Sequence, residues 1–468
     1  MSKESTGRKR RFLFGISAIP DQLTYQIFQF LTFTFYFTVV RLPIVYLAAG
    51  YIIWGIWNAI NDPLLGALSE RTTYKKKLGK RRFYIIISIL PLSIIMILLF
   101  YNPFDTSIAK FVYFLIIIIL FELFYSMFNV NMNAIFPDQF PDAKDRGATQ
   151  IYRNIMFVIA LILSSIIPGI IISDLVPKSD LAIPQIKNEY LTTGIIIAII
   201  IIFAAIPFII WGIKEKKETS EDFAKRPSLF DSFKKTLKNK TFLKFVIANT
   251  MIWYTFSIIP MVIPIYAEYV LNIPEGALFI SLSLMSCFIV AAISMPIHRL
   301  IGSKIGSRNG LLLSLTIGIA ILFPYFLITG EEFKIVFLIT TALVGFPLGG
   351  TMFYIDLIHS DIIDEDALKY GVRRGASFYG ILLLIQRLGI VLQILTIWMM
   401  FGTMGWEQEF IPVPDDLGLV IIGLKSLMFI FPAIAFMIAI LFLKSYSLHG
   451  EKLRNIREEI KNHPSLRT

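Results

Sequence analysis

The stretch Tyr51-Ile-Ile-Trp-Gly-Ile-Trp-Asn58-Ala-Ile-Asn61-Asp62-Pro63 places a carboxylate inside a long apolar segment. A charge at the centre of a membrane-spanning helix costs roughly 2.5–3.5 kcal/mol on insertion scales. Ionisable residues in such segments usually face a water-filled cavity or the interior of a helix bundle, and they mark the path of an ion, a proton or a substrate. Asp62 therefore predicts a membrane transporter.

The composition also indicates a protein of the membrane. The chain has 468 residues, of which 56% are hydrophobic and only 16% are charged, and its mean hydropathy is +0.70. Soluble globular domains carry about 25% charged residues. The net charge of +11 does not predict a nucleic-acid partner, because the basic residues lie in short segments beside apolar runs, where they set membrane orientation. The single cysteine, Cys287, excludes an internal disulfide framework and a cysteine-rich metal site.

About twelve apolar runs are long enough to cross a hydrocarbon core of roughly 30 Å. Basic residues gather in alternate loops between these runs, and the positive-inside rule then predicts that both termini are cytoplasmic. We expect a multi-pass protein integral to the cell membrane, with its first helix retained. The runs lie near residues 12–38, 43–67, 83–101, 109–136, 150–173, 191–213, 242–267, 276–297, 310–328, 334–358, 376–401 and 417–443.

The longest polar stretch follows the sixth run and divides the chain into two similar halves. Arg146-Gly-Ala-Thr149 recurs as Arg374-Gly-Ala-Ser377 at the equivalent place in the second half, although four residues can also match by chance. Repeat-built transporters place the substrate near the midplane, where the halves meet. We predict an all-α membrane protein of two pseudo-symmetric six-helix bundles, with an N-terminal bundle at 1–213, a cytoplasmic middle loop at 214–241, a C-terminal bundle at 242–445 and a cytoplasmic tail at 446–468.

Oxygen-bearing side chains of the second and fourth runs share one depth. At 1.5 Å per residue, Asp62 and Asn129 each lie roughly 12 Å inside the membrane. Asn58 and Asn61 share a helix face with Asp62, and Ser126 precedes Asn129 by three residues. Oxygen ligands suit a hard cation such as sodium, and a single carboxylate also suits a proton. We predict a cation site at Asp62, Asn58, Asn61 and Ser126, the alternative being ordinary hydrogen bonds between helices.

The first run carries a polar stripe of Asp21, Gln22, Gln26 and Gln29. Carboxylates and amides accept and donate hydrogen bonds in fixed geometry, which suits sugar hydroxyls. We predict that Asp21, Gln22 and Gln26 contact the substrate. The alternative is a stripe that packs the bundle.

Two opposite charges, Glu122 and Arg387, lie near the midplane on the fourth and eleventh runs. They predict either a structural ion pair between the halves or a coupling element that breaks and forms during transport. Arg153 lies only a turn or two inside the fifth run, so its side chain is as well placed to extend to the cytoplasmic surface as to stay inside the bundle.

Two motifs resemble the glycoside–pentoside–hexuronide:cation symporters, the melibiose-permease-like branch of the major facilitator superfamily. They are Trp57-Asn58-Ala-Ile-Asn61-Asp62-Pro63-Leu-Leu-Gly66, and Asp361-Ile-Ile-Asp364 with Gly371-Val-Arg-Arg374-Gly-Ala-Ser-Phe-Tyr379-Gly380. The resemblance covers nearly the whole chain and implies a two-bundle fold with alternating access. It also implies symport with sodium or protons, and places Asn58, Asn61, Asp62 and Ser126 at the cation site, Asp21, Asn129 and Arg153 at sugar contacts, and Arg387 at a functional lysine.

The sequence departs from this family at three positions. Asn58 and Asn129 stand where the sugar-binding members have carboxylates, and Arg387 replaces a lysine. The segments Phe121–Val130 and Pro20-Asp21-Gln22 also resemble lysolipid-carrying relatives of the same branch. Lysophospholipid transport is therefore the alternative to sugar transport.

Other functions have less support in the sequence. We find no Ser-His-Asp spacing, no HExxH and no phosphate-cradling loop, so we do not expect an enzyme. A non-transporting scaffold would have no use for Asp62, Glu122 and Arg387 inside the bilayer. We predict a secondary transporter that couples H⁺ or Na⁺ to the symport of a sugar or glycoside, as a monomer among membrane lipids, without a cofactor besides the coupling ion.

Overall fold

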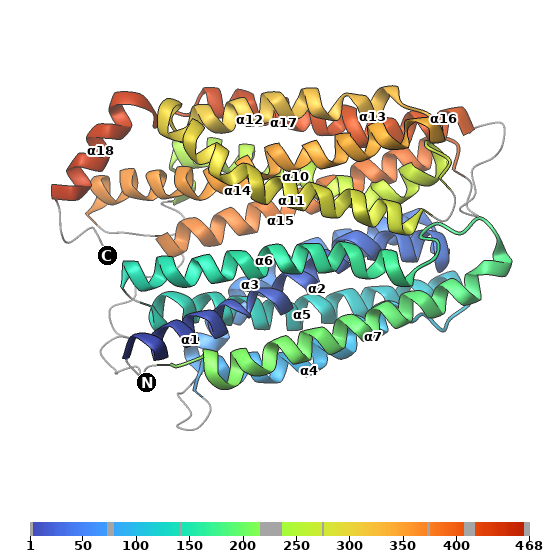
Figure 1. The fold of residues 1–468 in the computed structure, drawn as a ribbon, viewed down its shortest axis with the longest axis horizontal. Helices are drawn as coiled ribbons and strands as arrows, with labels where there is room; N and C mark the ends of the chain where they lie inside the picture. Colours follow the sequence, from blue (N-terminus) through green and yellow to red (C-terminus); the bar gives the residue numbers. More distant parts are fainter. Residues whose placement is uncertain are drawn as a thin grey trace.

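The computed structural model describes residues 3–72, 79–140, 142–215, 236–273, 276–371, 375–406 and 417–462. In these residues the long apolar runs are helices that lie roughly along the longest axis of the molecule (Figure 1). A bilayer offers no water to backbone N–H and C=O groups, and a helix satisfies them within one segment. Runs rich in isoleucine and phenylalanine, which favour strands in soluble proteins, are therefore helical here.

The first half of the chain forms the lower group of helices in Figure 1. Its first apolar run is divided, because α1 ends at Gly15 and α2 begins at Ala18. The elements of this half are α1 (Lys3–Gly15), α2 (Ala18–Thr34), the π-helix η1 (Phe35–Val39), α3 (Ile44–Arg71), α4 (Arg81–Leu99), α5 (Ser107–Gln139), α6 (Ala143–Ile171), η2 (Asp180–Ala182), α7 (Ile183–Pro207) and η3 (Phe208–Gly212).

The second half forms the upper group. Across the interface between the halves, α3 packs against α15 and α6 packs against α11. The elements of this half are α10 (Lys240–Tyr269), α11 (Ala277–Ile305), α12 (Ser307–Leu322), α13 (Pro324–Leu327), η4 (Glu331–Phe333), α14 (Lys334–Tyr370), α15 (Gly375–Thr403), α16 (Leu417–Lys425), η6 (Ser426–Ile430), α17 (Phe431–Lys444) and α18 (Gly450–Asn462).

Eleven helical segments of the described chain are long and apolar enough to cross a membrane, from Ile44–Gly66 to Leu417–Lys444. The 17-residue α2 continues directly into the five-residue η1. That continuous helix is about 33 Å long at 1.5 Å per residue, so the first predicted run also reaches the length of a span. The predicted all-α membrane fold is confirmed.

The outer faces of both groups are apolar. Large hydrophobic side chains are exposed along them, among them Ile56, Leu90, Ile116 and Leu441. Soluble monomers rarely expose large contiguous apolar patches. Such a surface suits contact with the hydrocarbon of a bilayer.

Aromatic packing fixes the helices that surround the interior of the first half. The rings of Phe28 on α2 and Phe121 on α5 stack with centroids 4.2 Å apart, and Phe28 also contacts Trp54 on α3 at 5.0 Å. All three side chains are almost fully buried. This cluster holds α2, α3 and α5 together beside their polar residues.

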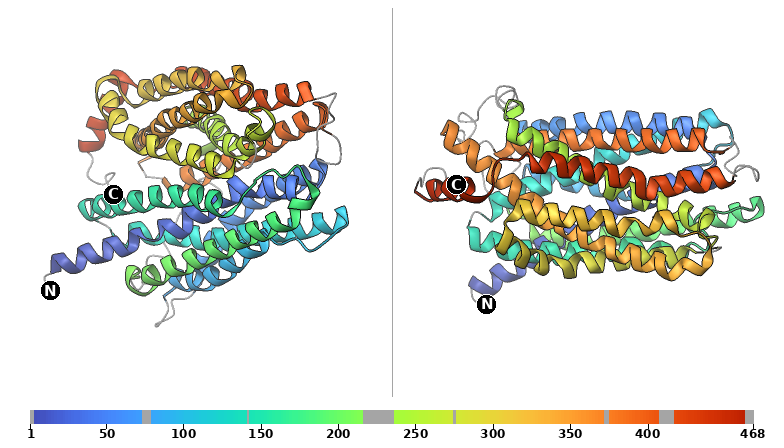
Figure 2. Two further views of the ribbon diagram at one scale, coloured as in Figure 1. Left: turned by 45° about the vertical axis from the view of Figure 1, so that its right-hand side comes forward. Right: turned by 90° about the horizontal axis from the view of Figure 1, so that it is seen from above.

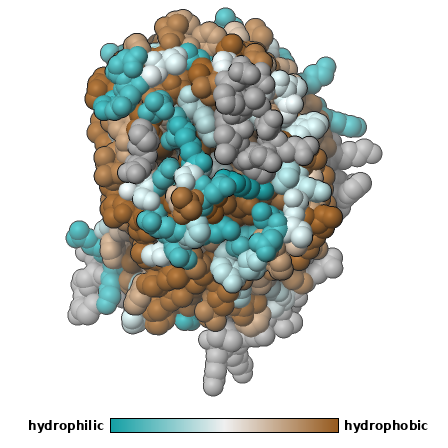
Figure 3. Space-filling model, turned by 90° about the vertical axis from the view of Figure 1, so that its right-hand side faces the viewer, coloured by the Kyte–Doolittle hydropathy of each residue, from teal (hydrophilic) through white to brown (hydrophobic). Residues whose placement is uncertain are grey.

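Helices α1 and α18 lie at the same end of the molecule (Figures 1 and 2). We call this end the inner end and the opposite end the outer end. Figure 3 shows the outer end, where hydrophilic residues gather across the middle and hydrophobic residues along the flanks.

The predicted domain boundaries stay a prediction. Most of the predicted middle loop 214–241 lies outside the described residues, and so does Arg374 of the second repeat motif.

Candidate cation and substrate site

Residues from three helices form a charged cluster between the halves. Asp62 lies on α3, Glu122 and Ser126 lie on α5, and Arg387 lies on α15. The Ser126 hydroxyl hydrogen-bonds with Asp62, and Nη2 of Arg387 lies 3.5 Å from Oδ2 of Asp62. Nη1 of Arg387 donates to the hydroxyl of Tyr25 at 3.3 Å. The cluster therefore joins the second half of the chain to the first.

Glu122 is the most enclosed member of this cluster, with no exposed surface. Nε1 of Trp54 donates to its Oε2 at 3.0 Å, and Ser126 Oγ lies 2.9 Å from its Oε1. Nδ2 of Asn61 donates to the backbone oxygen of Glu122 at 3.1 Å. The indole and the hydroxyl thus hold both carboxyl oxygens in place.

Ser126 contacts both carboxyl groups, which limits their charge states. A serine hydroxyl carries one proton and can donate only one hydrogen bond. It cannot donate to Asp62 and Glu122 at once. The second contact is therefore favourable only if that carboxyl group is protonated and donates to Ser126, or if a cation binds both the hydroxyl oxygen and the carboxylate oxygen. The guanidinium of Arg387 balances one carboxylate, and a second positive charge would balance the other. The cluster is therefore suited to take up one cation or proton.

The four residues predicted to form the cation site differ in their contacts. Asn58 and Asn61 have no exposed surface. Among described residues, neither polar atom of the Asn58 side chain has a hydrogen-bond partner, and neither has Oδ1 of Asn61. Amide oxygens of this kind are suitable ligands for a hard cation. The structure brings Asp62 and Ser126 into direct contact, whereas the contact of Asn61 is with the backbone of Glu122.

The predicted ion pair of Glu122 with Arg387 is replaced in the structure by a pair of Arg387 with Asp62. Arg387 forms its ion pair with Asp62, and between described residues it forms none with Glu122. The two are linked indirectly, because Ser126 contacts both Asp62 and Glu122. All three charged residues thus belong to one cluster.

A second polar network lies between α2, α5 and α6. Oδ1 of Asp21 accepts from Nδ2 of Asn129 at 2.6 Å, and Oδ2 accepts from Nε2 of Gln22 at 2.8 Å. Nδ2 of Asn133 donates to Oδ1 of Asn129 at 3.2 Å, and Nη2 of Arg153 donates to Oδ1 of Asn133 at 2.8 Å. A continuous chain of hydrogen bonds therefore connects Arg153 to Asp21.

Arg153 has no carboxylate in direct contact within this network of described residues. Between described residues it forms no ion pair, and its guanidinium lies 4.8 Å from the centroid of the Phe136 ring. Its polar contact is with a neutral amide. The network can therefore hold a solute with hydroxyl groups and, at Arg153, an anionic group.

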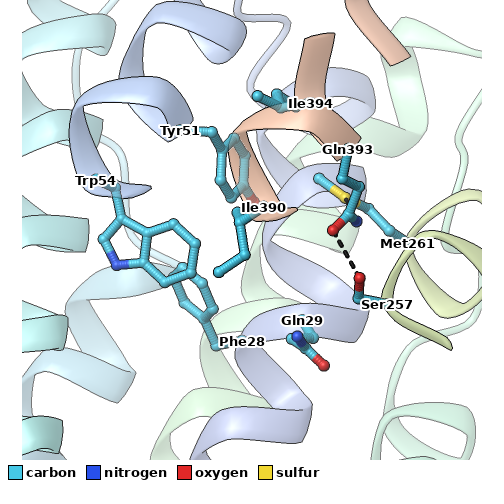
Figure 4. A pocket seen from close by; sticks show the side chains of 9 residues that line it. All are labelled: Phe28, Gln29, Tyr51, Trp54, Ser257, Met261, Ile390, Gln393 and Ile394. Carbon is cyan, nitrogen blue, oxygen red and sulfur yellow. Dashed lines mark hydrogen bonds between the residues drawn. The ribbon is translucent and has the colours of Figure 1, made fainter. Parts of the chain in front are cut away.

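Gln26 and Gln29 do not join this network. Both are half-buried, and among described residues neither forms a hydrogen bond with it. Gln29 lines a pocket between the halves that holds about 360 Å³ of empty space, part of it open (Figure 4). The other lining residues are Phe28, Tyr51, Trp54, Ser257, Met261, Ile390, Gln393 and Ile394.

Trp54 connects this pocket to the charged cluster. Its ring lines the pocket while its N–H donates to Glu122. On the opposite wall, Oε1 of Gln393 accepts from the Ser257 hydroxyl at 2.8 Å (Figure 4). The pocket and the cluster thus share one side chain.

Three residues of these networks were not predicted from the sequence, namely Trp54, Tyr25 and Asn133. Asn133 carried a usable signal, because it follows Asn129 by four residues and must share its helix face. Trp54 and Tyr25 gave none, since aromatic residues in apolar runs are mostly packing residues.

Comparison with known proteins identifies the family. The sequence profile described as MFS/sugar transport protein matches residues 13–450. This chain belongs to that family. It is a transporter of the major facilitator superfamily and not an enzyme, as the sequence analysis predicted. The narrower melibiose-permease-like assignment stays a prediction.

Individual relatives are distant but match over almost the full length. A putative sulfoquinovose importer of Salmonella typhimurium is 22% identical, over 97% of this chain and 92% of its own. The sodium-dependent lysophosphatidylcholine symporter 1-A of Danio rerio is 21% identical, over 94% and 85%. Among solved structures, a bacterial homologue of the human lysosomal transporter Spinster superposes with a TM-score of 0.64 at 13% identity, covering 95% of this chain and 98% of its own. That likeness supports the fold.

Proposed function

We propose that this transporter couples the uptake of a sugar or a related hydroxylated solute to a cation that binds at Asp62. The observation that carries this proposal is the cluster of Asp62, Glu122, Ser126 and Arg387 between the halves. Two carboxyl groups face one guanidinium there, and burial of an unbalanced charge is costly. Binding of one cation neutralises the second carboxylate. Because the cluster lies between the halves, its charge then affects how the two halves are held together.

We propose a proton as the coupling ion. A proton placed on either carboxyl group satisfies both contacts of Ser126, and it needs no further ligands. Sodium would instead need Asp62 and Ser126 together with the amide oxygens of Asn58 and Asn61. Uptake into vesicles under a sodium gradient at fixed pH separates the two ions, and strong stimulation by sodium would contradict the proton.

The substrate side of the proposal rests on the network from Asp21 to Arg153. Asp21, Gln22 and Asn129 offer acceptors and amide donors to hydroxyl groups, and Arg153 offers an anionic group a guanidinium that has no ion-pair partner among the described residues. A relative named as a sulfoquinovose importer supports a sugar that carries such a group. Gln26 was predicted to contact the substrate, but among described residues it forms no hydrogen bond with this network, so we propose that binding does not require it.

Lysophospholipid transport is the second candidate. It is supported by the relative named as a lysophosphatidylcholine symporter, and a phosphate group would also suit Arg153. Lysophospholipids need a long apolar site, however, and the pocket beside Trp54 includes the amides of Gln29 and Gln393.

A thermal-shift screen distinguishes the two substrate classes, because a ligand that binds only the folded state raises the apparent Tm. We expect neutral sugars and sugar acids to stabilise the purified protein and lysophosphatidylcholine to have little effect. Stabilisation by lysophosphatidylcholine, with no effect of a panel of mono- and disaccharides, would contradict the sugar assignment.

The remaining features of the proposal concern topology. We propose that the inner end is cytoplasmic, with both termini there, and that the halves follow the boundaries 1–213 and 242–445 on either side of the middle loop. We propose a monomer in the cell membrane.

A further inference from the structure

An ion pair joins the two halves at the outer end. Nζ of Lys178, in the connection between α6 and η2, lies 2.6 Å from Oε1 of Glu268 near the end of α10. The Glu268 side chain is only 6% exposed, whereas that of Lys178 is 49% exposed. Glu268 is therefore a nearly buried carboxylate, and its partner belongs to the other half of the chain.

Aromatic rings from both halves pack next to this pair. Nζ of Lys178 lies 5.6 Å from the centroid of the Tyr269 ring, and Tyr269 contacts Trp406 edge-on at 5.1 Å. Trp406 contacts Phe37 of the first half at 5.5 Å and stacks on Phe401 at 4.7 Å. Phe37 and Phe401 are also in contact at 4.9 Å. We call Phe37, Tyr269, Phe401 and Trp406 the aromatic seal.

The ion pairs of the inner end have a different arrangement. Each of the described ones joins residues of a single half, so none of them holds the halves together. They are Arg11–Asp145 and Arg81–Asp138 in the first half, and Lys452–Glu365 and Arg457–Asp361 in the second.

We propose that Lys178 and Glu268 form a latch over the aromatic seal, and that the outer end opens only when this pair separates. Separation would leave the nearly buried Glu268 carboxylate without its partner, which is unfavourable until water enters. The pair therefore stabilises the state that is closed at the outer end. This inference does not depend on which substrate or coupling ion the transporter uses.

A nearby ion pair provides a matched control. Arg41 and Asp180 also form an ion pair at the outer end, but both belong to the first half. Removing that pair changes the surface charge of the same end without separating the halves. Asp180→Asn should therefore leave the closed state unchanged.

The test measures access from the outer side to a position below the aromatic seal. Gln29 lines the pocket between the halves and lies two turns before Phe37 along the same continuous helix. In a variant with Cys287→Ser, which removes the native cysteine, Gln29→Cys supplies one labelling site for a membrane-impermeant maleimide. We expect Glu268→Gln to raise the labelling rate by about fivefold or more, since loss of about 1 kcal/mol changes an equilibrium by that factor.

Two further variants make the result decisive. Lys178→Gln, at the more exposed partner, should raise the rate in the same way if Glu268→Gln does not fold. The exchange Lys178→Glu with Glu268→Lys should restore slow labelling. The latch is wrong if the folded single variants label at the rate of the parent, or if Asp180→Asn accelerates labelling as much as they do.

Discussion

The two halves of this transporter share a fold but contribute unequally to its polar interior. The first half supplies Asp21, Asp62, Glu122 and Arg153, whereas the second half supplies Arg387 to the charged cluster. The pocket wall from the second half is otherwise neutral, with Gln393, Ser257 and apolar residues. We infer from this difference that the first half supplies most of the groups that bind the substrate and the cation. The second half senses the charge of the cluster through the ion pair of Arg387 with Asp62.

The largest effect should follow from removing the carboxylate of the substrate network. Asp21→Ala deletes the acceptor of both Asn129 and Gln22, and a site built to bind hydroxyl groups loses affinity when its partners are left unpaired. We expect loss of detectable sugar binding in the thermal-shift assay, with the Tm of the ligand-free protein reduced only slightly.

Gln26→Ala is the matched control, because Gln26 lies on the same helix outside the network. It should retain sugar binding. Equal loss of binding in both variants would show that these polar residues pack the bundle and do not contact the substrate directly. The proposal that the first half supplies the substrate site would then fail.

The next effect concerns the link between the halves. Arg387→Gln leaves Asp62 and Glu122 without their counter-charge, and breaking a buried ion pair costs about 3–5 kcal/mol. Both side chains are partly exposed, so we expect about 2 kcal/mol, measured as a fall in Tm. Adding Asp62→Asn should recover much of that loss, because the uncompensated charge is then removed.

Arg387→Lys sharpens this comparison. It keeps the charge but loses the fork geometry that reaches Asp62 and Tyr25 together. An intermediate Tm is expected. A double variant no more stable than Arg387→Gln alone would show that Arg387 does not act through Asp62.

The smallest predicted effect lies within the first half. Trp54→Phe keeps an aromatic ring in the pocket but removes the N–H that donates to Glu122, and the loss of one such hydrogen bond costs about 1 kcal/mol. We expect a modest fall in Tm. Trp57→Phe on the same helix is the control, since the Trp57 N–H has no partner among described residues. Equal changes in both variants would argue against a role for the Trp54 contact.

The sequence predicted the fold because the fold depends on local properties. The length of apolar runs and the position of basic loops are readable without a structure, and Asp62 was identified from its cost in a bilayer. Asp21 and Asn129 were predicted together only as sugar contacts, through the resemblance to the symporter family, and not as partners in a hydrogen bond. The number of residues along a helix gives the depth of a side chain in the membrane but not the neighbouring helix that it faces. The direction of the Arg153 side chain therefore could not be predicted.

What the sequence could not supply is contact between distant segments. Glu122 and Arg387 were both recognised as midplane charges, yet only the packing of α3 between α5 and α15 makes Asp62 the partner of Arg387. The latch at Lys178 and Glu268 gave no signal at all. Each residue sits near the end of an apolar run, where charges are common.

The central claim is that cation coupling passes through Asp62. The most direct measurement is uphill accumulation of a bound sugar in proteoliposomes under an imposed pH gradient without sodium, compared between the parent protein and Asp62→Asn, with Asp145→Asn as a control from the same half. The account predicts accumulation in the parent and the control and none in Asp62→Asn, which should still exchange substrate between equal pools. Uphill accumulation by Asp62→Asn at the level of the parent would contradict it.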